Sequence, residues 1–248
     1  MIDLHSHILP GLDDGCADLS ESVELARSLR ADGVRILAAT PHVRDDYPTT
    51  PEAMQAALGI AQLAIAEAGI DLQLVRGGEV ALDRFTRLGE ADLRSFGLGR
   101  AARYLLVEFP YDGFPIDLAD QITALESFGL TAILAHPERS LLVQDAPQRL
   151  AGLVDAGVLL QITAGSLTGA FGSGAAATAQ TLIDSGLAHL IGGDAHRAGS
   201  RPTIARAVRH VPRSLATWLV EDVPAAVLAG ERPPARPPQR RRLRLLRR

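Results

Sequence analysis

Short apolar runs alternate along the chain with longer segments whose apolar residues recur at helical spacing. Mostly apolar runs such as 34–39 and 130–135 are typical of strands that are buried on both faces. The segment 19–31 instead places apolar residues three positions apart and is followed by Gly33, as in a surface helix. On these grounds we predict strands over 2–5, 34–39, 70–75, 102–107, 130–135, 158–162 and 187–191, and helices over 19–31, 51–68, 118–128, 147–156 and 175–185.

The alternation of buried strands and helices predicts an α/β protein with a parallel sheet. Seven such units, without the ordering of an open nucleotide-binding sheet, favour closure into a barrel. The chain has 248 residues, 47% of them hydrophobic, which is enough for a large core. We assign residues 1–230 to one domain and expect residues 231–248, rich in Arg and Pro, to form a disordered tail.

Side chains that ligate metals follow the predicted strands, at or just past their carboxyl ends. In α/β barrels this end is the catalytic face. His5 and His7 are two positions apart at the end of the strand 2–5, so they can point out of it together and offer two imidazoles to one ion. Nitrogen and oxygen ligands of this kind suit Mn²⁺, Fe²⁺ or Zn²⁺. The candidate ligands are His5, His7, Asp14, His42, Glu79, Glu108, His136, Asp194 and His196.

Other reactive residues lack such neighbours and are interpreted as structural. His189 and His210 stand apart from the ligand motifs. Cys16 is the single cysteine, so no internal disulfide forms. A cysteine phosphatase needs an arginine six residues after its nucleophile, and that position is Ser22. Asp13 and Glu138 are expected to orient the ligands rather than to protonate a leaving group.

The charge distribution narrows the function further. All 25 basic residues are arginine, which excludes a lysine base or Schiff base. Eight of them lie in 232–248 without an acidic neighbour, so the tail carries +8 and residues 1–231 carry −12. An acidic body argues against nucleic-acid binding. With no signal-peptide pattern and no apolar run of membrane-spanning length, we expect a cytoplasmic protein.

The motifs as a set resemble one protein family. They are His-Ser-His-Ile-Leu-Pro-Gly-x-Asp-Asp-Gly from His5, Thr-Pro-His ending at His42, Gly-x-Glu ending at Glu79, Val-Glu-Phe-Pro around Glu108, Ala-His-Pro-Glu-Arg around His136, the run 161–169, and Asp-Ala-His from Asp194. In order and spacing they resemble the PHP-superfamily protein-tyrosine phosphatases of bacterial capsule and exopolysaccharide operons, over about residues 1–230. The resemblance implies a PHP fold, a distorted, TIM-like (β/α)7 barrel that holds two or three metal ions, with Mn²⁺ the first choice and Fe or Zn as alternatives.

The resemblance also distributes the ligands. It implies a first ion held by His5, His7, Glu79 and Asp194, a second held by Glu79, Glu108 and His136, and a third held by Asp14, His42 and His196. Glu79 would bridge the first two ions. Arg139 and Arg201 match the family's phosphate-contacting arginines.

The implied activity is metal-dependent hydrolysis of phosphotyrosine in a protein, with a bacterial tyrosine kinase as the expected partner. Two alternatives stay open, namely hydrolysis of a small phosphomonoester such as histidinol phosphate, and a metal-stabilised regulatory module without turnover. A nuclease or polymerase-associated PHP domain is opposed by the acidic body and the length. The Arg-rich tail suggests peripheral contact with a membrane or another anionic partner.

Overall fold

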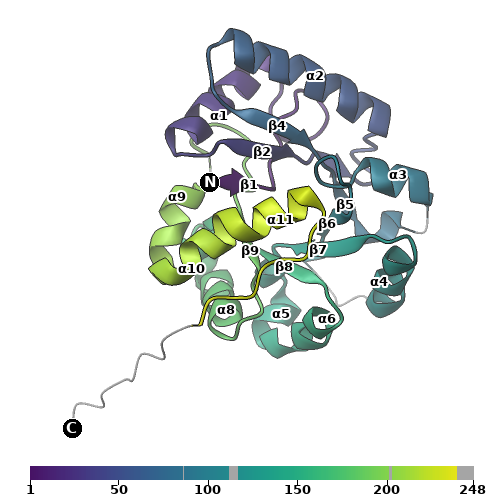
Figure 1. Ribbon diagram of the computed structural model, residues 1–248, viewed down its shortest axis with the longest axis vertical. Helices are drawn as coiled ribbons and strands as arrows, with labels where there is room; N and C mark the ends of the chain where they lie inside the picture. The colour runs from purple at the N-terminus through teal and green to yellow at the C-terminus, as the bar shows by residue number, and fades with distance from the viewer. Residues whose placement is uncertain (86, 112–116, 201–202, 239–248) are drawn as a thin grey trace.

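Short parallel strands form the centre of the fold and helices surround them (Figure 1). The computed structural model describes residues 1–85, 87–111, 117–200 and 203–238. Its strands are β1 (Ile2–Asp3), β2 (Ile36–Ala39), β3 (His42–Val43), β4 (Gln73–Arg76), β5 (Glu79–Ala81), β6 (Tyr104–Glu108), β7 (Thr131–Ala135), β8 (Leu159–Thr163) and β9 (Leu190–Gly192). Every strand pairing is parallel, which confirms the predicted α/β class.

The strands form two sheets, and the chain passes directly from one sheet to the other at two places. One sheet has the order β1-β2-β4, and the other has the order β3-β5-β6-β7-β8-β9. Two residues, Thr40 and Pro41, separate β2 from β3, and the pair Gly77 and Gly78 separates β4 from β5. A Cβ atom on Gly78 would lie 2.7 Å from the Phe96 ring, so glycine permits the close approach at this break. The short strands β3 and β5 lie just beyond the predicted strands 34–39 and 70–75 and were not predicted.

Residues after β9 also pair with residues after β1. A parallel bridge joins Ser6 to Ala195, the His7 amide donates to the Ala195 carbonyl over 2.8 Å, and the Asp194 amide donates to the His5 carbonyl over 2.9 Å. The first and last strands in sequence therefore lie side by side at their carboxyl ends.

The helices pack around these strands. They are α1 (Leu19–Ala31), α2 (Pro51–Glu67), α3 (Glu90–Ser95), α4 (Leu118–Ser127), α5 (Leu141–Asp145), α6 (Ala151–Asp155), α7 (Ala164–Leu167), α8 (Gly172–Asp184), α9 (Ile204–Ala207), α10 (Arg213–Thr217) and α11 (Val223–Ala229). Shorter turns are η1 (Leu82–Arg84), η2 (Pro137–Arg139), η3 (Pro147–Leu150), η4 (Val208–His210) and the π-helical turn η5 (Trp218–Asp222). In the part of the chain described, no helix is long and apolar enough to cross a membrane.

Helix α1 illustrates how local sequence sets these elements. The Asp18 side chain accepts a hydrogen bond from the Glu21 amide and so caps the first turn. Leu25 and Leu29 lie one turn apart and are both buried against the core. The helix spans the predicted residues 19–31 because capping and apolar spacing agree.

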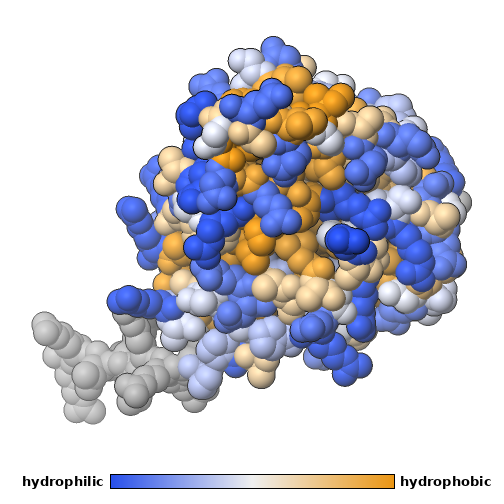
Figure 2. All heavy atoms as spheres, turned by 45° about the horizontal axis from the view of Figure 1, so that its top comes forward, coloured by the Kyte–Doolittle hydropathy of each residue, from blue (hydrophilic) through white to orange (hydrophobic). Residues whose placement is uncertain are grey.

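Helix α2 differs, because its outer face is partly apolar. Met54, Ala61 and Ile65 are its buried residues, whereas the side chains of Ile60 and Leu63 are 54% and 64% exposed. Figure 2 shows hydrophobic surface on the side of the molecule where α2 lies. This helix therefore keeps part of its apolar surface in solvent.

Residues 231–238, which we call the C-terminal strap, are the first part of the segment that was expected to form a disordered tail. They are extended and lie along the body instead of fraying from it (Figure 1). The Tyr104 hydroxyl donates to the Glu231 carbonyl over 2.7 Å, and Trp218 Nε1 donates to the Pro234 carbonyl over 2.9 Å. Arg236 donates to the carbonyls of Ala188 and Ile183. Aromatic donors on the body therefore hold a proline-rich segment that cannot form a helix itself. Residues 239–248 lie outside the described residues.

Candidate metal centre

All nine predicted ligands lie together, at the ends of strands or at the breaks that follow β2 and β4. His42 begins β3, Glu79 begins β5, Glu108 ends β6 and His136 directly follows β7. Their ligand atoms fall into four groups, within each of which the atoms lie within 4.8 Å of one another. The groups are His7, Asp14, His42 and His196; His5, Glu79 and His136; His5, His7 and Asp194; and His42, Glu79 and Glu108.

Glu79 lies at the centre of these groups and is fully buried. Its Oε1 is 2.9 Å from His136 Nε2, and its Oε2 is 3.2 Å from His5 Nε2 and 3.0 Å from His42 Nδ1. Among the described residues, Oε2 has no hydrogen-bond partner of good geometry. A buried carboxylate oxygen that faces several imidazoles is a suitable bridging ligand for metal ions, so the residues fit a metal centre.

The grouping differs in part from the distribution that the resemblance implied. His136 groups with His5 and Glu79, while Glu108 groups with His42 and Glu79, so the expected second set is divided. The reason is that the two oxygens of Glu79 face different neighbours. The expected third set, Asp14, His42 and His196, is found together and includes His7 as well.

Hydrogen bonds behind the ligands fix the orientation of the imidazoles. His5 Nδ1 lies 2.8 Å from Gln161 Oε1, and His7 Nδ1 lies 2.7 Å from Asp13 Oδ2. Both contacts leave Nε2 facing the cluster. Burial alone would raise the pKa of Asp13, but its hydrogen bonds with His7 and with backbone amides outweigh burial and lower it to about 2. Asp13 therefore stays ionised and holds His7 in place, as expected from the sequence.

The Glu138 carboxyl is buried too deeply to donate a proton to a substrate. It is fully buried, burial raises its pKa, and its Oε1 accepts a hydrogen bond from the Thr163 amide over 2.9 Å. This carboxyl therefore supports the turn after β7.

The field of the cluster favours cations. Burial opposes the charge of Glu79 and of Asp194, yet neighbouring imidazoles lower the pKa of both carboxyls well below its usual value. The same carboxylates raise the pKa of His5 and of His7 against the effect of burial. Ionised carboxylates in a buried pocket attract positive charge, which is what a metal site requires.

Two ligand positions have a left-handed backbone. His136 has φ 38° and Asp194 has φ 50°, a region that non-glycine residues rarely adopt. The His136 amide donates to the Gln161 carbonyl, and the Asp194 amide donates to the His5 carbonyl. Such strain persists only where the surroundings hold it and is concentrated at functional sites.

Arg139 lies beside the cluster, as expected. Its Nη1 donates to Asp194 Oδ2 over 3.1 Å. Its guanidinium lies over two rings, 4.6 Å from the Tyr111 centroid and 4.2 Å from the Phe171 centroid. These residues line a cavity of about 240 Å³ together with Gln144 and Ala175. The predicted partner of Arg139, Arg201, lies outside the described residues.

Sequence reasoning missed several residues of this site. Tyr111 stacks on His136 with ring centroids 5.6 Å apart, and Arg44 Nη1 donates to Glu108 Oε1 over 3.1 Å. Arg44 stands two positions after His42 and Tyr111 three after Glu108, so proximity to ligand motifs could have marked both. Phe171 had no comparable signal, because only the fold brings it to Arg139.

Cys16 is buried and its Sγ donates to the His196 carbonyl over 3.4 Å. Burial raises the pKa of its thiol to about 11, so it remains protonated. His189 lies just before β9, and His210 ends η4. Neither belongs to the four ligand groups.

The parallel α/β fold and the cluster at the carboxyl ends of its strands define an α/β protein with a candidate multinuclear metal centre. The chain belongs to the CpsB/CapC family, because the family model described as "Capsular polysaccharide synthesis, CpsB/CapC" matches residues 1–226. This confirms the family that the motifs indicated.

Relatives and solved structures agree with this assignment. The chain is 34% identical over 202 residues to the tyrosine-protein phosphatase YwqE of Bacillus subtilis, covering 81% of this chain and 79% of YwqE. It is 29% identical over 210 residues to the tyrosine-protein phosphatase CpsB of Streptococcus pneumoniae, covering 82% of this chain and 85% of CpsB.

This chain superposes with a TM-score of 0.84 at 30% identity on a crystal structure from a study of two proteins. These are YwqE of B. subtilis and CpsB of S. pneumoniae, which are described as metal-dependent tyrosine phosphatases. The match covers 97% of this chain and 100% of the other. The lactonase Lmo2620 of Listeria monocytogenes shares the fold only, with a TM-score of 0.52 at 13% identity over 94% of this chain and 92% of the lactonase.

Proposed function

We propose that this chain is a metal-dependent protein-tyrosine phosphatase. The observation that carries the proposal is the buried, Glu79-centred cluster with the Arg139 guanidinium at its edge. Transfer of a phosphoryl group needs positive charge near its oxygens and a nucleophile in line with the leaving group. Arg139 and ions held by the cluster would supply the positive charge, and a water activated by those ions would be the nucleophile. The names of the relatives support the same activity.

The chain's own residues provide orientation and charge. Arg139 binds the phosphate as a planar donor whose position is fixed by Tyr111 and Phe171. Asp13 and Gln161 keep His7 and His5 in the tautomer that presents Nε2 to the centre. Ions bound by the cluster supply an activated water and neutralise the phosphoryl charge. Cys16 is unsuited to act as a covalent nucleophile, because its thiol is buried and burial raises its pKa to about 11.

The nine ligands would hold two or three ions, and Mn²⁺ is the ion we propose first, with Fe or Zn as alternatives. The mixture of imidazole and carboxylate ligands suits each of these metals. Arg201 follows Asp194 and His196 in the sequence and would be the second phosphate-binding arginine.

The proposed substrate is a phosphotyrosine protein, and the capsule context of the family makes a bacterial tyrosine kinase the proposed partner, in the cytoplasm. Tyr111 and Leu141, with 39% and 62% of their surfaces exposed, form an apolar rim near Arg139, and the Leu141 amide faces the Tyr111 carbonyl. An exposed apolar rim can receive a phenyl ring and the peptide around it.

We further propose that the two sheets form one distorted (β/α)7 barrel. The continuation of β2 into β3 and of β4 into β5 supports this arrangement. The bridge between Ser6 and Ala195, which joins the end of β9 to the end of β1, supports closure.

The test combines metal analysis with kinetics. The purified protein should contain about two or three ions per chain. It should hydrolyse a phosphotyrosine peptide much faster than histidinol phosphate. His136→Ala should remove turnover and lower the metal content, while the matched control His210→Ala, a histidine outside the ligand groups, should change neither. Faster hydrolysis of histidinol phosphate would instead assign a small-molecule substrate, and full activity in metal-free protein would refute the proposal.

A further inference from the structure

A second cavity lies at the opposite end of the strands from the metal centre. It has a volume of about 480 Å³, and Tyr104 and Thr131, the first residues of β6 and β7, line it. The candidate ligands Glu108 and His136 lie at the other ends of the same two strands. The cavity is therefore separate from the proposed active site.

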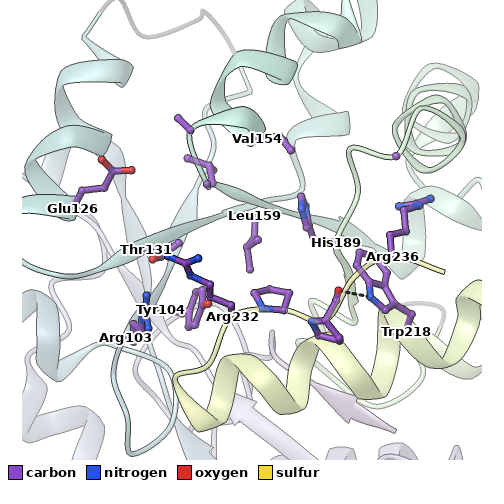
Figure 3. Close-up of a pocket in the computed structure, with 16 residues that line it drawn as sticks. Arg103, Tyr104, Glu126, Thr131, Val154, Leu159, His189, Trp218, Arg232 and Arg236 are labelled. Atoms are coloured by element: carbon purple, nitrogen blue, oxygen red, sulfur yellow. Dashed lines mark hydrogen bonds between the residues drawn. The ribbon is translucent and has the colours of Figure 1, made fainter. Parts of the chain in front are cut away.

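The C-terminal strap forms one wall of this cavity. Arg232, Pro233, Pro234 and Arg236 all line it, and Trp218 holds the strap through the Pro234 carbonyl (Figure 3). The cavity is thus complete only when the strap is docked.

The interior of the cavity is apolar and partly aromatic. Val154, Val158 and Leu159 line its floor, and Tyr104 and Trp218 contribute aromatic rings. Figure 3 shows Leu159 in the middle, with Arg103 and Arg232 on one side and His189 and Arg236 on the other. A flat apolar ring bound in this cavity would remove apolar surface of the ring and of the lining from water.

The polar groups around the apolar floor are mostly donors. His189 Nδ1 accepts a hydrogen bond from the Leu160 amide over 3.2 Å, which places the imidazole hydrogen on Nε2. Burial and the nearby Arg236 lower the pKa of His189 to about 4, so the ring is neutral at pH 7 and is an Nε2 donor. The Thr131 hydroxyl adds another donor group to the lining.

The charge of the lining is positive. Three guanidinium groups, on Arg103, Arg232 and Arg236, line the cavity with a single carboxylate, on Glu126. Arg236 is engaged by two carbonyls and Arg103 by the Gly230 carbonyl. The Arg232 side chain is exposed and, within the described residues, its guanidinium forms no hydrogen bond or ion pair. It is therefore the cation that a ligand can engage without breaking an existing contact.

We propose that this cavity binds a small organic anion that carries a phosphate or carboxylate on a flat apolar ring. The ring lies between Tyr104, Leu159 and Trp218, and the anionic group pairs with Arg232. Such a site is positive within a chain whose net charge is −4, so it selects for charge as well as for shape.

The chain offers a direct probe, because Trp218 is its only tryptophan and lines the cavity. The full-length protein is titrated with phenylphosphonate, whose carbon–phosphorus bond the phosphatase does not hydrolyse, and separately with benzoate. At least one of them should change the Trp218 fluorescence saturably at millimolar concentrations, and the tighter of the two identifies the anionic group. Benzylamine, a cation with the same ring, should not bind.

Arg232→Gln should weaken binding roughly fivefold or more, because a charge-assisted pair is lost. The matched control Arg213→Gln removes an exposed arginine that does not line the cavity and should leave binding unchanged. Both variants should hydrolyse a phosphotyrosine peptide like wild type, so failure of this proposal is separable from failure of the proposed activity. Absence of saturable binding, equal binding of benzylamine, or equal binding by the two variants would overturn the proposal.

Discussion

Arg139 and Asp194 form an ion pair that joins the arginine to the ligand cluster. Arg139 Nη1 lies 3.1 Å from Asp194 Oδ2, and Oδ1 of the same carboxylate lies 3.4 Å from His7 Nε2. The guanidinium also lies over the Tyr111 and Phe171 rings, which restrict its orientation. A phosphate that reaches the cluster therefore meets an arginine whose plane is already set.

The first prediction concerns this arginine. Arg139→Ala should lower kcat/KM roughly 10²- to 10³-fold, as loss of one positioned donor to a transition state does. Arg139→Lys should recover only part of the loss, because a point charge lacks the planar fork. Steady-state kinetics and metal content, measured on the same preparations, test this, and metal content should be unchanged. Wild-type kinetics in both variants would assign Arg139 a structural role.

The aromatic rings give a second prediction. Phe171→Ala should reduce kcat/KM less than Arg139→Ala does, because it loosens the guanidinium without removing it. In an Arg139→Ala background the same change should have almost no further effect. A double-mutant cycle of kcat/KM measures this coupling. Equal effects of Phe171→Ala in both backgrounds would mean that the ring acts independently of Arg139.

Cys16 gives a third prediction. Cys16→Ser should keep activity within about twofold, because the buried side chain donates to the His196 carbonyl and serine retains a donor. Alkylating reagents should not inhibit the folded enzyme, since its thiol is buried and burial raises the pKa to about 11. Loss of activity in a well-folded Cys16→Ser protein would point to covalent catalysis.

The buried His189 should make the free energy of unfolding depend on pH. Its folded pKa of about 4 lies below the unfolded value of 6.5, so the unfolded chain binds more protons between these values. The stabilisation is complete above pH 6.5 and is lost as the pH falls toward 4, by up to about 3 kcal/mol. Urea unfolding from pH 7 to pH 4 should show a shallower loss for His189→Gln than for wild type. The exposed His210→Gln serves as the control, and equal slopes in all three proteins would contradict the assignment.

The sequence singled out the nine residues that the structure brings together, because each is part of a motif near a strand end. His42 and Glu79 were found although β3 and β5, the two short strands that carry them, were not predicted as separate elements. Those strands were missed because Thr40-Pro41 and Gly77-Gly78 interrupt longer strands, and two or three residues give no periodicity. A candidate ligand can be recognised from the motif around it. The interruption of a strand depends instead on tertiary packing, such as that of Phe96 against Gly78.

The contacts of Arg139 and of the strap were not predictable in the same way. Phe171 lies 32 positions from Arg139, and no spacing rule relates them. The prolines of 232–238 account for the absence of a helix there, but composition does not predict the docking of this segment, which depends on Tyr104 and Trp218. Pairing between distant single residues is set by the fold and not by pattern.

The last prediction separates the two parts of the C-terminal segment. A chain that ends at Gly230 loses the hydrogen bonds that Tyr104 and Trp218 donate to the strap. It also loses the two that Arg236 of the strap donates to the body. At about 0.5–1.5 kcal/mol for each of these four hydrogen bonds, their loss should lower the Tm by roughly 4–24 °C. A chain that ends at Pro238 keeps these contacts and should unfold like the full chain, although it lacks six arginines.

If those six arginines tether the protein to an anionic surface, the chain ending at Pro238 should bind anionic lipid vesicles less than the full chain does. The difference should disappear at high salt, because screening weakens each contribution of about 1 kcal/mol. Calorimetry and vesicle sedimentation on the three chains measure the two effects independently. Equal Tm values for the chains ending at Gly230 and Pro238 would contradict a stabilising strap, and equal vesicle binding by the full chain and the chain ending at Pro238 at low salt would contradict the tether.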